Sequence, residues 1–283
     1  MRPLVIGSPE HKELLCRFFI DSHDPYEPAA LAWPELDEDA RKRLAMLPIW
    51  EEALRTEADT ALAVTTMGEA EQDPLLSEAI RLQGYEEARH AELLKLLTRK
   101  YRIQVPDFSS TRPPRPDWAF MRIGYGECFD SFFAFGLFAL ARDSGFFPPA
   151  LVTLFEPVMQ EEGRHIIFHV NWVAYNQARL PYAERPAYLF RRGLAVWLQL
   201  ISRFKTALRV KTSVDDRAQD NFTMNAHAQF GDVTPREFVE LCLAENERRL
   251  APYDPRLLRP AFVPRVAQAV LRTLPRGAQP VAA

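Results

Sequence analysis

The chain has 283 residues, of which 47% are hydrophobic, and its formal charge of −3 makes it slightly acidic. This length allows one large domain or two small ones with a sizeable core, and the charge argues against binding to nucleic acid, which needs a basic face. Three widely separated cysteines exclude a disulfide framework and a cysteine-rich metal ribbon. The sequence shows no signal peptide and no run of about 18 apolar residues, so we expect a cytoplasmic protein without a transmembrane segment.

Prolines mark the starts of the predicted helices, because proline is favoured at the first helical position. No stretch of the sequence alternates in the way a strand does, which predicts an all-α fold. Two short helices come first, four long helices follow, and further helices complete the chain. Their predicted ranges are 8–20, 37–47, 48–72, 73–99, 116–145, 148–180, 185–210, 215–228 and 234–250.

The loops predict how the four long helices are connected. Very short loops join the first to the second and the third to the fourth, so each pair is expected to be antiparallel. The linker 101–116 is rich in proline, and its sixteen residues can extend over roughly 50 Å. A helix of 25 residues is only roughly 38 Å long, so the linker can cross the whole bundle. One long crossover is the connectivity of a ferritin-like four-helix bundle.

The sequence therefore divides into three parts. Residues 1–47 are expected to form short N-terminal helices, residues 48–180 the four-helix bundle, and residues 181–283 a helical extension packed on the bundle. The tail 251–276 carries five arginines and one acidic residue. We expect it to be a helix packed on the bundle, with a docking or membrane-surface segment as the alternative.

A five-residue motif occurs twice, on the second and the fourth long helix. Residues 86–90 read Glu-Glu-Ala-Arg-His, and residues 161–165 read Glu-Glu-Gly-Arg-His. In each copy the second Glu and the His are three positions apart, so both side chains lie on one helix face and can reach the same metal ion. One such pair arises easily by chance in a charged helix, whereas two copies on separate helices indicate a shared site.

A dinuclear site also needs a carboxylate from each of the other two helices. Glu127 lies in an apolar stretch with almost no other charge. Burying it without a partner would be costly, so we expect it to bind a metal, or else to pair with an arginine. On the first long helix, Glu57 shares its face with apolar residues whereas Glu52 faces water, which makes Glu57 the inward carboxylate.

The predicted metal ligands are thus four carboxylates and two imidazoles. This donor set suits iron or manganese better than structural zinc. Its four negative charges neutralise two divalent ions, and without the ions the carboxylates would repel one another and take up protons. The ligands are Glu57, Glu87, His90, Glu127, Glu162 and His165.

On these residues the chain resembles the ferritin-like diiron carboxylate superfamily, over about residues 48–178. The separations from Glu57 to Glu87 and from Glu127 to Glu162 are similar to those of its oxygen-activating members. The resemblance implies two iron ions, or manganese in one position, that use dioxygen to hydroxylate, N-oxygenate or desaturate a small organic substrate. It also implies a reductase or ferredoxin as electron donor, because the sequence has no flavin or nicotinamide fingerprint, and a homodimer is common in the family.

Two other functions stay open at this point. One is the handling of iron or peroxide, as in ferritins and rubrerythrins, which predicts a cage-like oligomer that takes up many irons per chain. The other is a helical module whose site is only structural. The lack of a cysteine ribbon and the extra hundred residues distinguish the chain from rubrerythrins and ordinary ferritins.

Two further residues are candidates for catalytic roles. Asp130 follows Glu127 by one turn and could orient a ligand histidine through its ring N–H, or pair with Arg89 or Arg164. His169 follows the second motif by one turn and is expected either to bind metal or to line a pocket beside it.

The first glutamates of the two motifs, Glu86 and Glu161, point about 100° away from the neighbouring ligands. We therefore expect them to form ion pairs rather than to bind metal.

Overall fold

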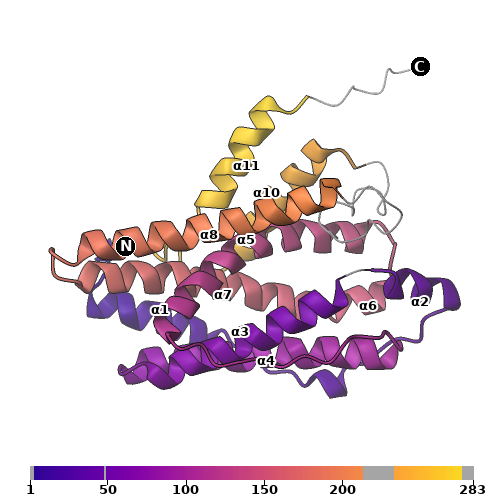
Figure 1. Ribbon diagram of the computed structural model, residues 1–283, viewed down its shortest axis with the longest axis horizontal. Coiled ribbons are helices and arrows are strands. Elements are labelled where there is room, and N and C mark those ends of the chain that lie inside the picture. Colours follow the sequence, from indigo (N-terminus) through magenta and orange to yellow (C-terminus); the bar gives the residue numbers. More distant parts are fainter. Residues whose placement is uncertain (1–2, 48, 213–232, 276–283) are drawn as a thin grey trace.

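The computed structural model describes residues 3–47, 49–212 and 233–275. Every regular element in this part of the chain is a helix, so the predicted all-α class is confirmed there (Figure 1). The predicted helix near 215–228 lies outside the described residues. In chain order the elements are α1 (Pro9–Asp21), η1 (Pro28–Ala30), α2 (Glu38–Ala45), α3 (Trp50–Ala70), α4 (Pro74–Lys100), α5 (Pro116–Asp143), α6 (Pro149–Thr153), α7 (Glu156–Arg179), α8 (Arg185–Thr212), α10 (Pro235–Leu250) and α11 (Phe262–Thr273).

Prolines and capping residues fix the helix starts much as the sequence predicts. Asp73 caps α4 by accepting hydrogen bonds from the backbone N–H groups of Leu75 and Leu76, with Pro74 at the first position. Thr234 caps α10 in the same way.

The fourth long helix differs from its prediction, because it is interrupted between α6 and α7. Pro157 occupies the second position of α7. Inside a continuous helix its ring would clash with the carbonyl group of Thr153, and it has no N–H to donate. The prediction of one unbroken helix over 148–180 was therefore wrong, and α7 begins only at Glu156.

Four long helices, α3, α4, α5 and α7, pack as a bundle. Helix α3 packs along α4, and α5 packs along α7. The linker between α4 and α5 follows α3 from one end to the other (Figure 1). Phe108 lies under the guanidinium of Arg55 near the start of α3, and Arg112 pairs with Glu69 near its end. The predicted long linker therefore spans the length of α3.

Helix α5 is the most apolar of the long helices and lies in the middle of the fold. It packs against α3, α7, α8 and α10. By length and composition alone it could cross a membrane, but 67% of its most apolar stretch is buried inside the protein. This degree of burial is typical of the core helix of a globular protein.

The C-terminal helices α8, α10 and α11 dock on α5. Their contact is an apolar cluster made by α5, α10 and α11, which partly buried side chains of α8 extend. Helix α10 comes closest where Gly136 of α5 faces Cys242. The buried members of the cluster are Phe129, Phe132, Cys242, Val263 and Ala267.

The domain boundaries after residues 47 and 180 stay predictions.

The docking of α10 on α5 predicts that Gly136→Ala destabilises the protein. The new methyl carbon would lie 2.3 Å from Cys242 Sγ, so the helices must separate. Overpacking of this kind costs about 1–3 kcal/mol, or roughly 5 °C in Tm for a chain of this size. Gly193→Ala is the matched control, because nothing lies within 4 Å of the new methyl group on α8. Equal Tm values for the two variants, measured by differential scanning fluorimetry, would contradict the observed docking.

Candidate metal centre

The structure brings all six predicted ligands together near the middle of the bundle. They fall into two groups that share Glu87, and within each group the donor atoms lie within 4.8 Å of one another. Each of the four long helices contributes, so the cluster depends on their mutual packing. The first group is Glu57, Glu87, His90 and Glu162, and the second is Glu87, Glu127 and His165.

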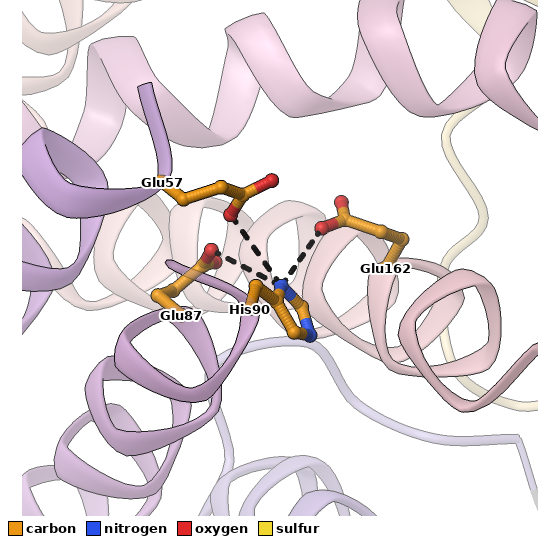
Figure 2. A group of neighbouring side chains, drawn as sticks. All are labelled: Glu57, Glu87, His90 and Glu162. Carbon is orange, nitrogen blue, oxygen red and sulfur yellow. Dashed lines mark ion pairs between the residues drawn. The ribbon is translucent and has the colours of Figure 1, made fainter. Parts of the chain in front are cut away.

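In the first group three carboxylates converge on one imidazole nitrogen. His90 Nδ1 lies 3.5 Å from a carboxylate oxygen of Glu57 and 3.5 Å from one of Glu162. It lies 3.7 Å from Glu87 Oε2. Figure 2 shows the three side chains pointing at this nitrogen from different directions, as ligands of one ion beside it would.

The second group is built around the other motif histidine. His165 Nδ1 lies 3.0 Å from Glu87 Oε1, whereas the other oxygen of Glu87 faces His90. Glu87 therefore presents one oxygen to each group, which is the arrangement of a carboxylate that bridges two ions. Ser131 on α5 donates a hydrogen bond to Glu162 Oε2 at 3.0 Å and so fixes that carboxylate.

The outer nitrogen of each histidine is bound by a carboxylate from the opposite motif. His90 Nε2 on α4 is 2.8 Å from Glu161 Oε2 on α7, and His165 Nε2 on α7 is 2.9 Å from Glu86 Oε2 on α4. With a metal bound, the ring N–H of each pair would donate to the carboxylate, which would leave the Nδ1 lone pair available to the ion. These two bonds run in opposite directions between α4 and α7.

The motif arginines complete this crossed arrangement. Arg89 pairs with Glu161, and Arg164 Nη1 donates to Glu86 Oε1 at 2.8 Å. All four side chains are buried. Each guanidinium offsets the charge of one outer carboxylate, so the four inner carboxylates remain to neutralise cations. Ion pairs were expected for the two outer glutamates, but their bonds to the opposite histidines were not.

The N-terminal segment covers the outer side of this network. Arg164 donates to the carbonyl oxygen of Phe19, and Arg89 donates to the carbonyl oxygen of Tyr26. The Nδ1 atom of His23 lies 2.5 Å from Glu86 Oε1, and its side chain is 18% exposed. The last turn of α1 and the loop after it therefore position both arginines, and the loop brings one partly exposed imidazole beside Glu86.

Burial and crowding shift the protonation of the inner groups. Burial raises the pKa of Glu57 to about 7, and repulsion from Glu87 and Glu162 adds to the effect. Burial likewise raises the pKa of Glu127 well above its ordinary value. Burial alone would lower the pKa of His90, but the surrounding carboxylates outweigh it and raise that pKa. Without metal, protons therefore take the place of the missing positive charge.

The outer carboxylate behaves in the opposite way. Burial alone would raise the pKa of Glu86, but its bonds to His165 and Arg164 lower it to about 2. Glu86 therefore stays ionised and keeps accepting the imidazole N–H.

The inner donor atoms fit a bound pair of cations. Buried polar atoms without a hydrogen-bond partner are rare in native proteins. Among the described residues, three such atoms belong to the predicted ligands, and bound ions would give them the partners they lack. The atoms are His90 Nδ1, Glu127 Oε1 and His165 Nδ1.

Comparison of the chain with known protein families, curated proteins and solved structures found no match. In its described residues the chain is all-helical and has buried carboxylate and histidine groups able to hold metal.

Asp130 does not lie with the cluster. It is an exposed residue of α5 and pairs with Arg203 of α8. In the structure Glu86 and Glu161, rather than Asp130, lie against the two motif histidines.

His169 is buried beside the cluster but belongs to neither ligand group. Its ring packs against Phe120, Tyr125 and Trp172, and against the backbone of Gly124. Burial lowers the pKa of His169 to about 3, and the charge of Arg192 adds to this effect. The imidazole is therefore neutral and lines the apolar wall between α5 and α7.

The crossed bonds predict that Glu86→Gln weakens metal binding while leaving every inner ligand in place. The amide cannot offset Arg164 and holds the His165 N–H less strongly. Loss of such an outer partner typically costs about 10–100-fold in metal affinity. Titration with Mn(II), followed by electron paramagnetic resonance, measures the change. Glu52→Gln, at an exposed position of α3, is the control and should bind as the parent does. Unchanged affinity in Glu86→Gln would contradict the proposed role.

The raised pKa values predict an unusual pH dependence for the metal-free protein. The folded state binds the Glu57 proton more tightly than the unfolded chain, and this advantage is lost as the pH rises through about 7. The pKa values of His90 and His165 are also raised, so these residues likewise lower the stability of the folded state as the pH rises above about 6.5. We expect Tm to fall by roughly 5 °C between about pH 6 and pH 8.

Metal should reverse this trend, because its binding displaces those protons and strengthens as the pH rises. Thermal unfolding of metal-free and Mn(II)-loaded protein over the same pH range makes the comparison. Parallel pH profiles for the two forms would show that the inner groups do not hold the ion.

Proposed function

We propose that this chain is a ferritin-like diiron enzyme that uses dioxygen to hydroxylate, N-oxygenate or desaturate a small organic substrate. The observation that carries the proposal is the pair of histidine–carboxylate groups joined by Glu87 and held from outside by Glu86 and Glu161. Oxygen and imidazole donors in this ratio suit iron or manganese. Two separate groups with one shared carboxylate suit two ions better than one.

The packing of the helices supports the ferritin-like assignment. In that fold each of two helices supplies a Glu, and each of the other two supplies a Glu-x-x-His pair. Here α3 and α5 supply Glu57 and Glu127, and α4 and α7 supply the two pairs. The linker that follows α3 provides the long connection that this topology requires.

Each inner residue has a definable task in this function. A bound pair of ferrous ions would supply the electrons that reduce dioxygen. Glu87 would hold the two ions close together through its two oxygens, and Ser131 keeps Glu162 turned toward the first group. Glu86 and Glu161 keep the proton of each ligand histidine on Nε2, so that Nδ1 stays available. The electrons consumed in turnover would come from a separate reductase or ferredoxin.

A surface groove of about 420 Å³ marks a route for the substrate. It lies between α3, the linker and α5, with Gln199 of α8 at its edge. Thr60 in its wall is one turn beyond Glu57 on α3, and Ile123 is one turn before Glu127 on α5. None of the six inner residues lines the groove itself, so the proposed route would continue from Thr60 and Ile123 to the ligands one turn away.

The test is to load metal-free protein with Fe(II) without air and then to add oxygen. We expect two irons per chain, oxygen uptake and a transient visible absorption. Glu127→Ala should bind less iron and lose most of the uptake, whereas Glu52→Gln should match the parent. Many irons per chain in a cage-like oligomer would favour iron storage instead. One iron or none, with no oxygen reaction, would overturn the proposal.

A further inference from the structure

Exposed large apolar side chains are concentrated on the C-terminal helices. Of the twelve in the described part of the chain, nine lie between residues 182 and 270. Scattered exposed apolar residues are normal, whereas a concentration on neighbouring elements marks an interaction surface. The nine are Tyr182, Leu189, Phe190, Leu194, Trp197, Leu258, Phe262, Val266 and Val270.

Helix α8 carries one apolar row on each side. Its inner row, which includes Ala195 and Val196, faces the α5 side of the fold. Its outer row consists of Phe190, Leu194 and Trp197, spaced as residues of one helix face are. Phe190 is 71% exposed and Trp197 is 59% exposed.

Helix α11 repeats this pattern. Val263 and Ala267 join the cluster on α5, whereas Phe262, Val266 and Val270 form a second, exposed row, in which Phe262 also makes an edge contact with Phe129. Figure 1 shows α11 (yellow) projecting from the body of the protein beyond α8. We call the outer rows of the two helices the α8–α11 face.

The basic residues of the two helices differ in their partners. On α8, Arg191 pairs with Asp117 and Arg203 pairs with Asp130, both on α5. On α11 the basic residues are Arg265 and Arg272, both exposed, and the sequence of this helix holds no aspartate or glutamate. The charge beside the outer row of α11 is therefore positive, which suits an anionic partner.

We propose that the α8–α11 face binds the surface of an anionic lipid bilayer. Exposed aromatic rings together with basic residues are typical of helices that lie in the membrane interface. Helix α11 has 12 residues and is roughly 18 Å long, too short to cross a hydrocarbon core of about 30 Å. The inner row of α8 is held against the protein, so this helix can only lie along the membrane.

The charges disfavour a second copy of the chain as the occupant. In a symmetric dimer the face would pack against itself, which would bring basic residues against basic residues. An anionic lipid surface instead attracts each basic residue near it. This proposal does not depend on the metal centre.

Co-sedimentation of the full-length protein with lipid vesicles tests the proposal. We expect binding to vesicles of phosphatidylcholine mixed with phosphatidylglycerol, and weaker binding to phosphatidylcholine alone. Added salt should reduce the binding. Arg272→Gln should weaken it about fivefold, and Val266→Glu about tenfold or more. Met46→Glu, at an exposed apolar position of another region, is the matched control and should bind as the parent does.

Two results would overturn the proposal. One is the absence of vesicle binding at low salt by protein that is correctly folded, as judged by its circular dichroism. The other is a dimer in light scattering that Phe190→Glu or Val266→Glu converts to a monomer, because the face would then be an interface between copies.

Discussion

The crossed bonds between α4 and α7 are the interaction on which the rest of the centre depends. Each helix supplies a histidine whose outer nitrogen is bound by a glutamate of the other helix, and each of those glutamates is in turn bound by an arginine. Buried charges are tolerated only when they are paired and fully hydrogen-bonded. These bonds therefore fix the register of α4 against α7 and, with it, the position of Glu87 between the two histidines.

The other elements shield these buried charges from solvent. Helix α1 packs against both α4 and α7, and its last turn and the loop after it each supply a carbonyl acceptor for one buried arginine. On the inner side, α3 and α5 each add one carboxylate. The neutral ring of His169, with its aromatic neighbours, forms an apolar wall beside them. The cost of burying the four carboxylates is then offset by cations or, without metal, by protons.

Sequence reasoning found the six inner residues because their pattern is local. The repeated motif places Glu87 with His90 on one face, and a lone acid in an apolar stretch points to Glu127. The sequence predicts Asp130 beside a motif histidine or arginine, but Asp130 pairs with Arg203 instead. Helical periodicity does not reveal that α8 packs close enough for Arg203 to bind this residue. Glu86 and Glu161 each bind the histidine of the opposite motif, a contact between helices that the spacing within one motif cannot predict. The repetition of the first Glu and of the Arg in both motifs is the sequence signal that points to these residues.

The helix boundaries show the same limit. Proline and capping residues predict the starts of α4 and α10, whereas Pro157 lies inside a predicted helix and ends it there, so that α7 begins as a new helix. The all-α class follows from composition and periodicity, whereas the docking of α8, α10 and α11 on α5 depends on contacts between distant residues.

The two outer glutamates have unequal neighbours, although the motifs that supply them are nearly the same. An aromatic ring covers each arginine: the ring of Tyr26 lies 3.9 Å from the guanidinium of Arg89, and the ring of Phe19 lies 4.5 Å from that of Arg164. Only Glu86 also has an imidazole beside it, that of His23, which is partly exposed to solvent. The pseudo-symmetry of the centre is therefore broken at its boundary. One outer carboxylate is reached by a titratable side chain from the surface and the other is not, so two chemically similar positions have different dielectric surroundings.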